Sequence, residues 1–251
     1  MSGHSKWSTI KRAKGVTDQK RGALFSRLSR ELSIAARTGG ADPAMNVRLR
    51  LIIQKARDVN MPADNISRAV QRGVGGAEGA NLVELTLEGY GPGGVAIMVA
   101  ALSDNRNRTI QEVRNVLSRH GGSLAESGAV AWLFDSRGVI TAETATPEET
   151  ALEAIDAGAE DVKTEEALIE VYTRPHDLER VRRALEAKNL KITSSDISLV
   201  PRSTVMVEER TAIQNLKLLE SLEEMEDVRF VNTNLDYSEA VLEKLKHSGL
   251  V

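Results

Sequence analysis

Lysine and arginine residues are concentrated in the N-terminal part of the chain, where they could bind a polyanion. Residues 1–76 contain 15 Lys and Arg against 5 Asp and Glu, a net charge of +10. Residues 77–251 contain 18 against 31, a net charge of −13. Because cations that neutralise phosphates are the basis of sequence-independent nucleic-acid binding, this asymmetry predicts a polyanion-binding end joined to an acidic body. The alternative is a solvated basic surface without a partner.

The candidate nucleic-acid contacts fall into three groups. The first lies in a basic tail that has no helical apolar stripe, and it comprises Lys6, Trp7, Lys11, Arg12, Lys14, Lys20 and Arg21. The second lies on the polar faces of three expected helices and comprises Arg27, Arg30, Arg37, Arg48, Lys55, Arg68 and Arg72. The third is the pair Arg106 and Arg108 at the start of a later helix.

Three of these candidates carry a structural alternative. Trp7 could stack on a base or ribose, or it could anchor the tail on its own domain. Arg106 and Arg108 oppose the dipole at a helix N-terminus, which indicates either an anionic partner or an ion pair with a carboxylate within the fold.

No residue pattern of an active site is recognisable. The chain has no cysteine, and its histidines (His4, His120, His176 and His247) lack metal-ligand spacing. The paired acids are adjacent in sequence and typical of a solvated face, whereas catalytic pairs need unlike environments. Gly89–Gly94 is better explained as a hairpin turn than as a phosphate loop, because it joins two strands. We therefore expect a non-enzymatic protein without a cofactor or metal.

Three helices must position the cations of the second group. Apolar residues at spacings of three and four predict helices over 22–38 and 44–59, and Pro62 suits the first turn of a third, short helix that Gly73 ends. The outer surface of this domain should be nearly all cationic. The short last helix offers few polar groups for reading base edges, so contacts mainly to backbone phosphates are expected.

From residue 82 the apolar pattern changes to that of strands and helices. A β-hairpin is expected over 82–102, a helix over 106–120, a strand over 130–134 and a βαββαβ-like passage after it. The predicted fold class is α+β, with a small N-terminal helical domain followed by two ferredoxin-like domains, one inserted in the other. The expected divisions are the tail 1–21, the helical domain 22–76, a split domain 80–134 plus 203–251, and an inserted domain 135–202.

Hydropathy and the charged N-terminus indicate a cytoplasmic protein. The longest apolar run, Val95–Leu102, is far shorter than the roughly 20 residues that a membrane span needs. No contact with a membrane is expected, and the absence of cysteine fits the reducing cytosol.

Several longer motifs resemble the YebC/PmpR family from end to end. They are Gly3–Trp7 with Ile10 and Lys11, Arg21-Gly22 with Phe25 and Leu28, Asn46, Leu49-Arg50, Asn60–Pro62, Asp64–Ile66, Glu88–Gly94, Asp104–Thr109, His120–Gly122 and Val130–Trp132. The chain departs from the family pattern at Val47, where proline is usual, and at Arg12–Lys14, where a more basic run is common.

The resemblance implies a three-domain bacterial cytoplasmic protein that is not an enzyme. The family is described as probable DNA-binding transcriptional regulators, so the leading expectation is a regulator that binds duplex DNA. The family also includes mitochondrial translational activators, which leaves a ribosome-associated factor that binds ribosomal RNA and relieves stalled synthesis as an alternative. A protein-interaction module that uses the acidic domains is a third hypothesis.

Overall fold

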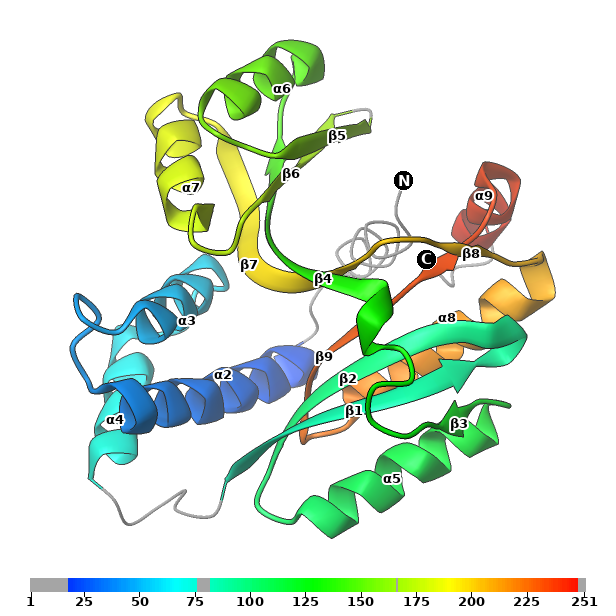
Figure 1. Ribbon diagram of the computed structural model, residues 1–251. Coiled ribbons are helices and arrows are strands. Elements are labelled where there is room, and N and C mark those ends of the chain that lie inside the picture. The colour runs from blue at the N-terminus through cyan, green and yellow to red at the C-terminus, as the bar shows by residue number, and fades with distance from the viewer. Residues whose placement is uncertain (1–17, 76–81, 166, 248–251) are drawn as a thin grey trace.

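The N-terminal part of the computed structural model, which describes residues 18–75, 82–165 and 167–247, is a unit of three helices (Figure 1). This helical unit, residues 18–75, consists of α2 (Asp18–Gly39), α3 (Val47–Asp58) and α4 (Ala63–Val74). Its core contains Leu28 and Leu32 of α2, Leu49 of α3 and Ile66 of α4. The three predicted helices are confirmed, although α2 begins four residues earlier than expected.

Asn46 explains why α3 begins at residue 47 and not at residue 44. Its side-chain oxygen accepts a hydrogen bond from the N–H of Leu49 (3.0 Å), which caps the helix. Its amide nitrogen donates to the carbonyls of Ala35 and Gly40, both at 2.8 Å. One buried side chain therefore ends α2, starts α3 and holds the two helices together.

The first sheet has four antiparallel strands in the order β3–β1–β2–β9. The strands are β1 (Val83–Gly91), β2 (Val95–Ser103), β3 (Ser123–Leu124) and β9 (Val228–Thr233). Two helices, α5 (Arg106–Arg119) and α8 (Glu209–Glu224), bury apolar residues such as Leu117 and Leu219 in the main core of this sheet. A short parallel pair, β8 (Val205–Met206) and β10 (Leu235–Asp236), and a last helix, α9 (Glu239–His247), complete this unit.

The second sheet has four antiparallel strands in the order β5–β6–β4–β7. Its elements are β4 (Phe134–Glu143), α6 (Pro147–Asp156), β5 (Asp161–Glu165), β6 (Leu168–Thr173), α7 (Leu178–Ala187) and β7 (Lys191–Pro201). This βαββαβ succession, with the third strand between the first two, is the ferredoxin-like arrangement. The predicted α+β fold class is confirmed.

The chain passes from the first sheet to the second and later returns. Strand β9 pairs with β2 across more than a hundred intervening residues, and the second sheet is formed entirely from residues 134–201. The split-domain interpretation requires such a return. The domain boundaries themselves stay a prediction.

The strand expected over 130–134 is wrong. The segment forms a short 3-10 helix, η2 (Ala131–Leu133), before β4 begins. The Glu88 carboxylate accepts hydrogen bonds, at 2.6–2.9 Å, from three backbone N–H groups at and just before the start of this segment, those of Gly128, Val130 and Ala131. Because these donors are bound by a side chain, they are not available to a strand ladder.

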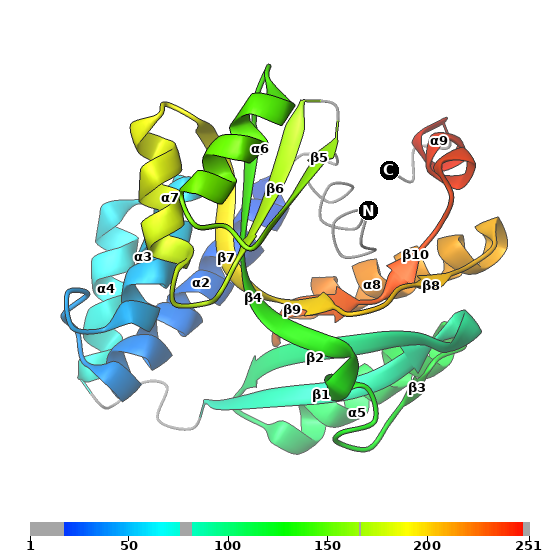
Figure 2. The ribbon, with the colours of Figure 1, turned by 45° about the horizontal axis from the view of Figure 1, so that its top comes forward.

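The helical unit lies against both sheets (Figure 2). Helix α3 lies beside β7, and Leu51 packs against the core of the second sheet. Helix α2 reaches β9 of the first sheet through an ion pair between Glu31 and Arg229. The two sheet units together, residues 82–247, are called the body below.

Candidate nucleic-acid interface

The tail candidates cannot be placed by the structure. Lys6, Trp7, Lys11, Arg12 and Lys14 lie outside the described residues, and so does the side chain of Lys20. Arg21 is exposed near the start of α2. Their contacts with nucleic acid stay a prediction.

Three predicted cations of the helical unit face the acidic body. The pairs are Arg30 with Glu226 and Asp227, Arg48 with Glu84, and Lys55 with Asp196. The helical wheel separates polar from apolar faces, but it does not show that a second unit covers part of the polar face. Part of the surface that was expected to be nearly all cationic is therefore covered by the acidic body, and contacts of these residues with nucleic acid stay a prediction.

Two further cations of α2 also lie near groups of the body. The guanidinium of Arg37 donates to the Leu82 carbonyl at 3.0 Å. Arg27 is partly buried, and burial lowers its pKa although the nearby Glu223 carboxylate acts against that change. Both residues thus lie at the boundary between α2 and the first sheet unit.

The most buried ion pair at this boundary joins Glu31 of α2 to Arg229 of β9. The Arg229 Nη2 atom lies 2.9 Å from the Glu31 carboxylate, and the side chains are 17% and 7% exposed. Burial acts to lower the pKa of Arg229, but the Glu31 charge and hydrogen bond outweigh it and raise that pKa. This charge pair joins α2 directly to the first sheet.

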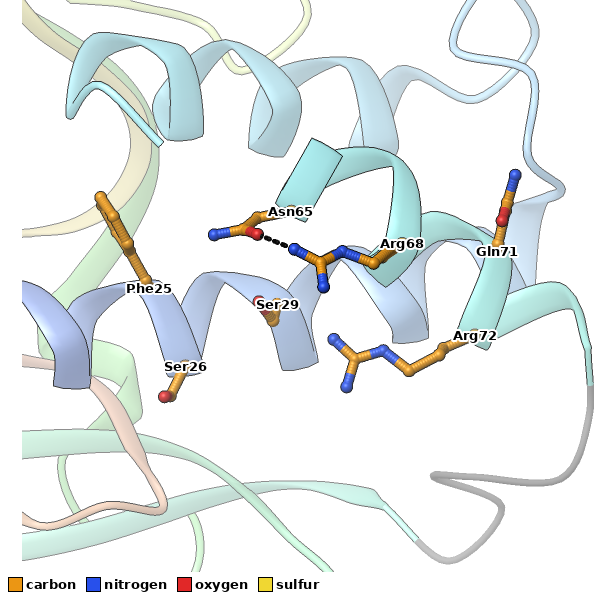
Figure 3. A pocket seen from close by; sticks show the side chains of 7 residues that line it. All are labelled: Phe25, Ser26, Ser29, Asn65, Arg68, Gln71 and Arg72. Carbon is orange, nitrogen blue, oxygen red and sulfur yellow. Dashed lines mark hydrogen bonds between the residues drawn. The ribbon is translucent and has the colours of Figure 1, made fainter. Parts of the chain in front are cut away.

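Arg68 and Arg72 of α4 differ from these cations, because neither pairs with a carboxylate in the part of the chain that the structure describes. Both are exposed and lie four residues apart, so they share one face of the helix. Arg68 donates to the side chain of Asn65 and to the Asp64 carbonyl of its own helix. Figure 3 shows both guanidinium groups projecting from α4 towards α2.

These two arginines line a groove between α2 and α4 with a volume of about 700 Å³. Its described lining residues are Phe25, Ser26, Ser29, Asn65, Arg68, Gln71 and Arg72. The lining combines two cations, several hydrogen-bonding groups and one aromatic ring, and it includes no acidic side chain. Such a combination suits an anionic ligand that also has a flat apolar part.

The two arginines of the Asp104–Thr109 segment have different surroundings. Asn105 caps α5 by accepting the N–H of Arg108 at 3.1 Å. The Arg108 guanidinium donates to Asp104 at 2.8 Å and to Asp227 at 2.9 Å, which is the ion pair within the fold that the sequence left open. Arg106 is exposed and has no hydrogen-bond or ion-pair partner among the residues described.

Asp227 organises the polar contacts beside this segment. Its buried carboxylate accepts hydrogen bonds from the hydroxyls of Thr109 (2.6 Å) and Ser103 (3.0 Å), besides the one from Arg108. Burial acts to raise the pKa of Asp227, but these hydrogen bonds and the Arg108 charge outweigh it and lower that pKa. Arg30 of the helical unit approaches the same carboxylate at 3.4 Å.

The sites considered for other chemistry have structural roles. Gly89–Gly94 lies in the β1–β2 hairpin as expected, and Asn215 donates to the Pro92 carbonyl in its turn at 2.9 Å. Within residues 18–75, 82–165 and 167–247, no group of three or more His, Asp or Glu residues could hold a metal ion. In the same ranges no helix has the length and apolarity to cross a membrane.

Comparison with known proteins supports the arrangement. The family models described as "TACO1/YebC protein N-terminal domain" and "TACO1/YebC second and third domain" match residues 5–76 and 82–235. The chain belongs to the TACO1/YebC family. The predicted resemblance to YebC/PmpR proteins is thereby confirmed.

Relatives in the TACO1/YebC family match this chain over nearly its full length. A "Probable transcriptional regulatory protein" of Dehalococcoides mccartyi strain BAV1 is 55% identical over 97% of this chain and 98% of its own. A protein of the same description from Halothermothrix orenii is 49% identical, over 98% and 99%. The crystal structure of a conserved hypothetical protein from Aquifex aeolicus superposes with a TM-score of 0.82 at 45% identity, covering 88% of this chain and 93% of that one.

Sequence reasoning placed Arg68 and Arg72 among the candidates of this TACO1/YebC chain but missed the groove. Phe25 and Asn65 belong to motifs that carry the family resemblance, and Phe25 lies beside the apolar stripe of α2. The signal that could have found the groove was the presence of an aromatic residue where the stripe borders the polar face. The approach of α4 to Ser29 depends on tertiary packing and had no sequence signal.

Proposed function

We propose that this protein is a cytoplasmic, non-enzymatic regulator of gene expression that binds nucleic acid through its basic N-terminal part. The regulatory role at family level rests on relatives that are named probable transcriptional regulatory proteins. The leading version is a DNA-binding transcriptional regulator.

One observation carries the proposal. Arg68 and Arg72 project from α4 into a groove whose described lining includes no acidic residue, whereas Arg30, Arg48 and Lys55 are engaged with the body. Cations that are exposed and have no carboxylate partner can neutralise phosphates without first breaking an internal ion pair.

The proposed contacts therefore differ in whether an ion pair within the chain must first be broken. Arg68, Arg72 and Arg106 are the described candidates that need no rearrangement, and the tail adds Lys6, Trp7, Lys11, Arg12 and Lys14 from outside the described residues. Arg30, Arg48, Lys55 and Arg108 would have to exchange carboxylate partners for phosphates.

A second candidate function is a ribosome-associated translation factor that binds ribosomal RNA. The groove favours it, because a pocket between two helices suits an unpaired nucleotide better than a stacked duplex, and unpaired nucleotides are the usual recognition sites in RNA. A protein-interaction module is less favoured, because acidic residues of the body such as Glu84 and Asp196 already pair with the helical unit.

Sedimentation of cell lysate through a density gradient, with and without nuclease, distinguishes the two functions. A transcriptional regulator should migrate free of ribosomes and bind duplex DNA in a separate mobility-shift assay. Migration with ribosomes would decide for translation. Failure to bind either duplex DNA or RNA at low salt would overturn both versions.

The tail can be tested by replacing Lys6, Lys11, Arg12 and Lys14 with Ala. Binding should weaken several-fold while the thermal midpoint is unchanged, because the replaced side chains carry only the electrostatic contribution. If contacts involve about 6–10 phosphates, wild-type affinity falls roughly 10³–10⁵-fold between 50 and 200 mM salt. Unchanged affinity of the variant would show that the tail is not a contact.

A further inference from the structure

The groove between α2 and α4 carries an inference that rests on the proposed function and makes it more specific. We propose that it binds one unpaired nucleotide of a nucleic-acid strand, with the base against Phe25 and the phosphate between Arg68 and Arg72. The ligand class is a nucleotide within a phosphodiester chain, whether in single-stranded DNA or in an RNA loop.

The size and shape of the groove fit this ligand. Its volume of about 700 Å³ lies within the range of sites that enclose small organic ligands. Gly73 holds α4 close to α2, because a Cβ atom at this position would lie 2.1 Å from the Ser33 carbonyl oxygen. The Ser33 hydroxyl also donates across the contact to the Ala69 carbonyl at 2.7 Å. The close packing of the two helices therefore sets the width of the groove.

The cationic side of the groove suits a phosphate. Arg72 has neither an ion pair nor a hydrogen bond within the described part of the chain, and Arg68 is oriented by Asn65 of its own helix. Figure 3 shows the two guanidinium groups on the same side of α4, pointing back along α2. Two planar forks facing one space match the oxygens of a phosphate group.

The aromatic side of the groove suits a base. Phe25 is the only aromatic residue between positions 18 and 75, in a chain with 3% aromatic residues. It is partly exposed and lies at the groove, on α2 and apart from the arginines (Figure 3). A base stacked on an aromatic ring is a recurrent contact of proteins that bind single strands, and it requires the base to be unpaired.

The remaining lining groups supply hydrogen bonds. Ser26, Ser29 and Gln71 also line the groove, and their side chains carry hydroxyl and amide groups. They can meet the edge of a base or a sugar hydroxyl, whereas a duplex offers neither a free base face nor an exposed Watson–Crick edge. The whole lining therefore favours an unpaired nucleotide over a duplex.

Fluorescence anisotropy with the full chain tests this inference. The probes are labelled oligo-dT, oligo-U of the same length and a blunt duplex of the same length, all at one salt concentration. The wild type should bind at least one of the two unpaired probes more tightly than the duplex, and the tighter of the two identifies the source as DNA or RNA. Equal affinity for the three probes would overturn the inference.

Phe25→Leu separates stacking from charge. Leucine keeps apolar contact with the helical core, so the thermal midpoint should change little, while affinity for the unpaired probe should fall by about tenfold. Affinity for the duplex should be unchanged. A variant that binds the unpaired probe as tightly as the wild type would contradict the proposed role of Phe25.

Arg72→Ala and Arg57→Ala form a matched pair for the phosphate contact. Both arginines are exposed on the helical unit without a partner in the described ranges, but only Arg72 lines the groove. Arg72→Ala should weaken unpaired-probe binding more than Arg57→Ala, and equal losses would overturn the assignment. If the wild type binds no nucleic acid at all, the proposed function itself fails; if all probes bind equally with steep salt dependence, only the groove assignment fails.

Discussion

Replacement of Glu31 by Gln should destabilise the protein far more than the same change at Glu226. Both glutamates pair with an arginine across the boundary between the helical unit and the body, but Glu31 is 7% exposed and Glu226 is 76% exposed. The Glu31→Gln variant leaves the Arg229 charge buried without its main partner. Truncation of one partner of a buried ion pair is strongly destabilising, whereas an exposed pair contributes little.

The magnitude follows from the geometry. At 2.9 Å and an effective dielectric constant of about 20, the gross attraction between Arg229 and Glu31 is about 6 kcal/mol. Desolvation offsets part of it, glutamine keeps one hydrogen bond, and Glu84 lies 3.7 Å from Arg229 as a second partner. We therefore expect a loss of about 3 kcal/mol, near the lower end of values for broken buried pairs.

Thermal unfolding followed by circular dichroism measures this difference. A loss of about 3 kcal/mol should lower the midpoint by roughly 6–12 °C in a chain of this size. The Glu226→Gln control should lose less than about 1 kcal/mol of stability relative to the wild type, and high salt should remove even that small loss. Equal midpoints for the two variants would refute the view that the Glu31–Arg229 pair fixes α2 on the body.

Asp227→Asn should cost most stability above pH of about 4 and progressively less below it. Because the pKa of Asp227 is lowered in the folded state, its contribution to stability is present above the unfolded-state pKa and lost as pH falls through the folded-state value. Unfolding curves measured across acid pH check this. A stability difference between variant and wild type that does not change with pH would contradict it. Arg106→Ala should lower nucleic-acid affinity without changing the thermal midpoint. Arg108→Ala should lower the midpoint, because Asp227 loses a hydrogen-bond donor. The reverse pattern in these two assays would contradict both assignments. Gly73→Ala should destabilise by about 1–3 kcal/mol through its clash with α2. Gly22→Ala, which meets nothing within 4 Å, should stabilise by about 0.5–1 kcal/mol, so equal unfolding midpoints would argue against close α2–α4 packing.

The sequence predicted most of the helices and strands, because each one leaves a local pattern of apolar or turn-forming residues. Leu28 and Leu32 mark the buried stripe of α2, and the Gly89–Gly94 turn marks the hairpin. The strand expected over 130–134 failed because the donors of that segment bind the Glu88 carboxylate, from a residue about forty positions earlier. Apolar content alone could not reveal that long-range contact.

The candidate interface was predictable only in part, for a similar reason. The charge count identified the basic end, and the helical wheel placed Arg30 and Arg68 on polar faces alike. Whether a polar face meets solvent or an acidic neighbour depends on tertiary packing: Arg30 meets Glu226, whereas Arg68 does not meet a carboxylate among the described residues. The groove needed two helices to be brought together by Gly73, a contact without a sequence period.

The central claim is that the basic helical unit binds nucleic acid through the arginines of the α2–α4 groove. The most direct test is the salt dependence of binding for the wild type and for the Arg68→Ala/Arg72→Ala double variant. The slope of log affinity against log salt should be shallower in the variant by about 0.7 for a single strand, or about 0.9 if the partner is a duplex, since the two arginines share one phosphate. Parallel lines of equal affinity for the two proteins would contradict the account.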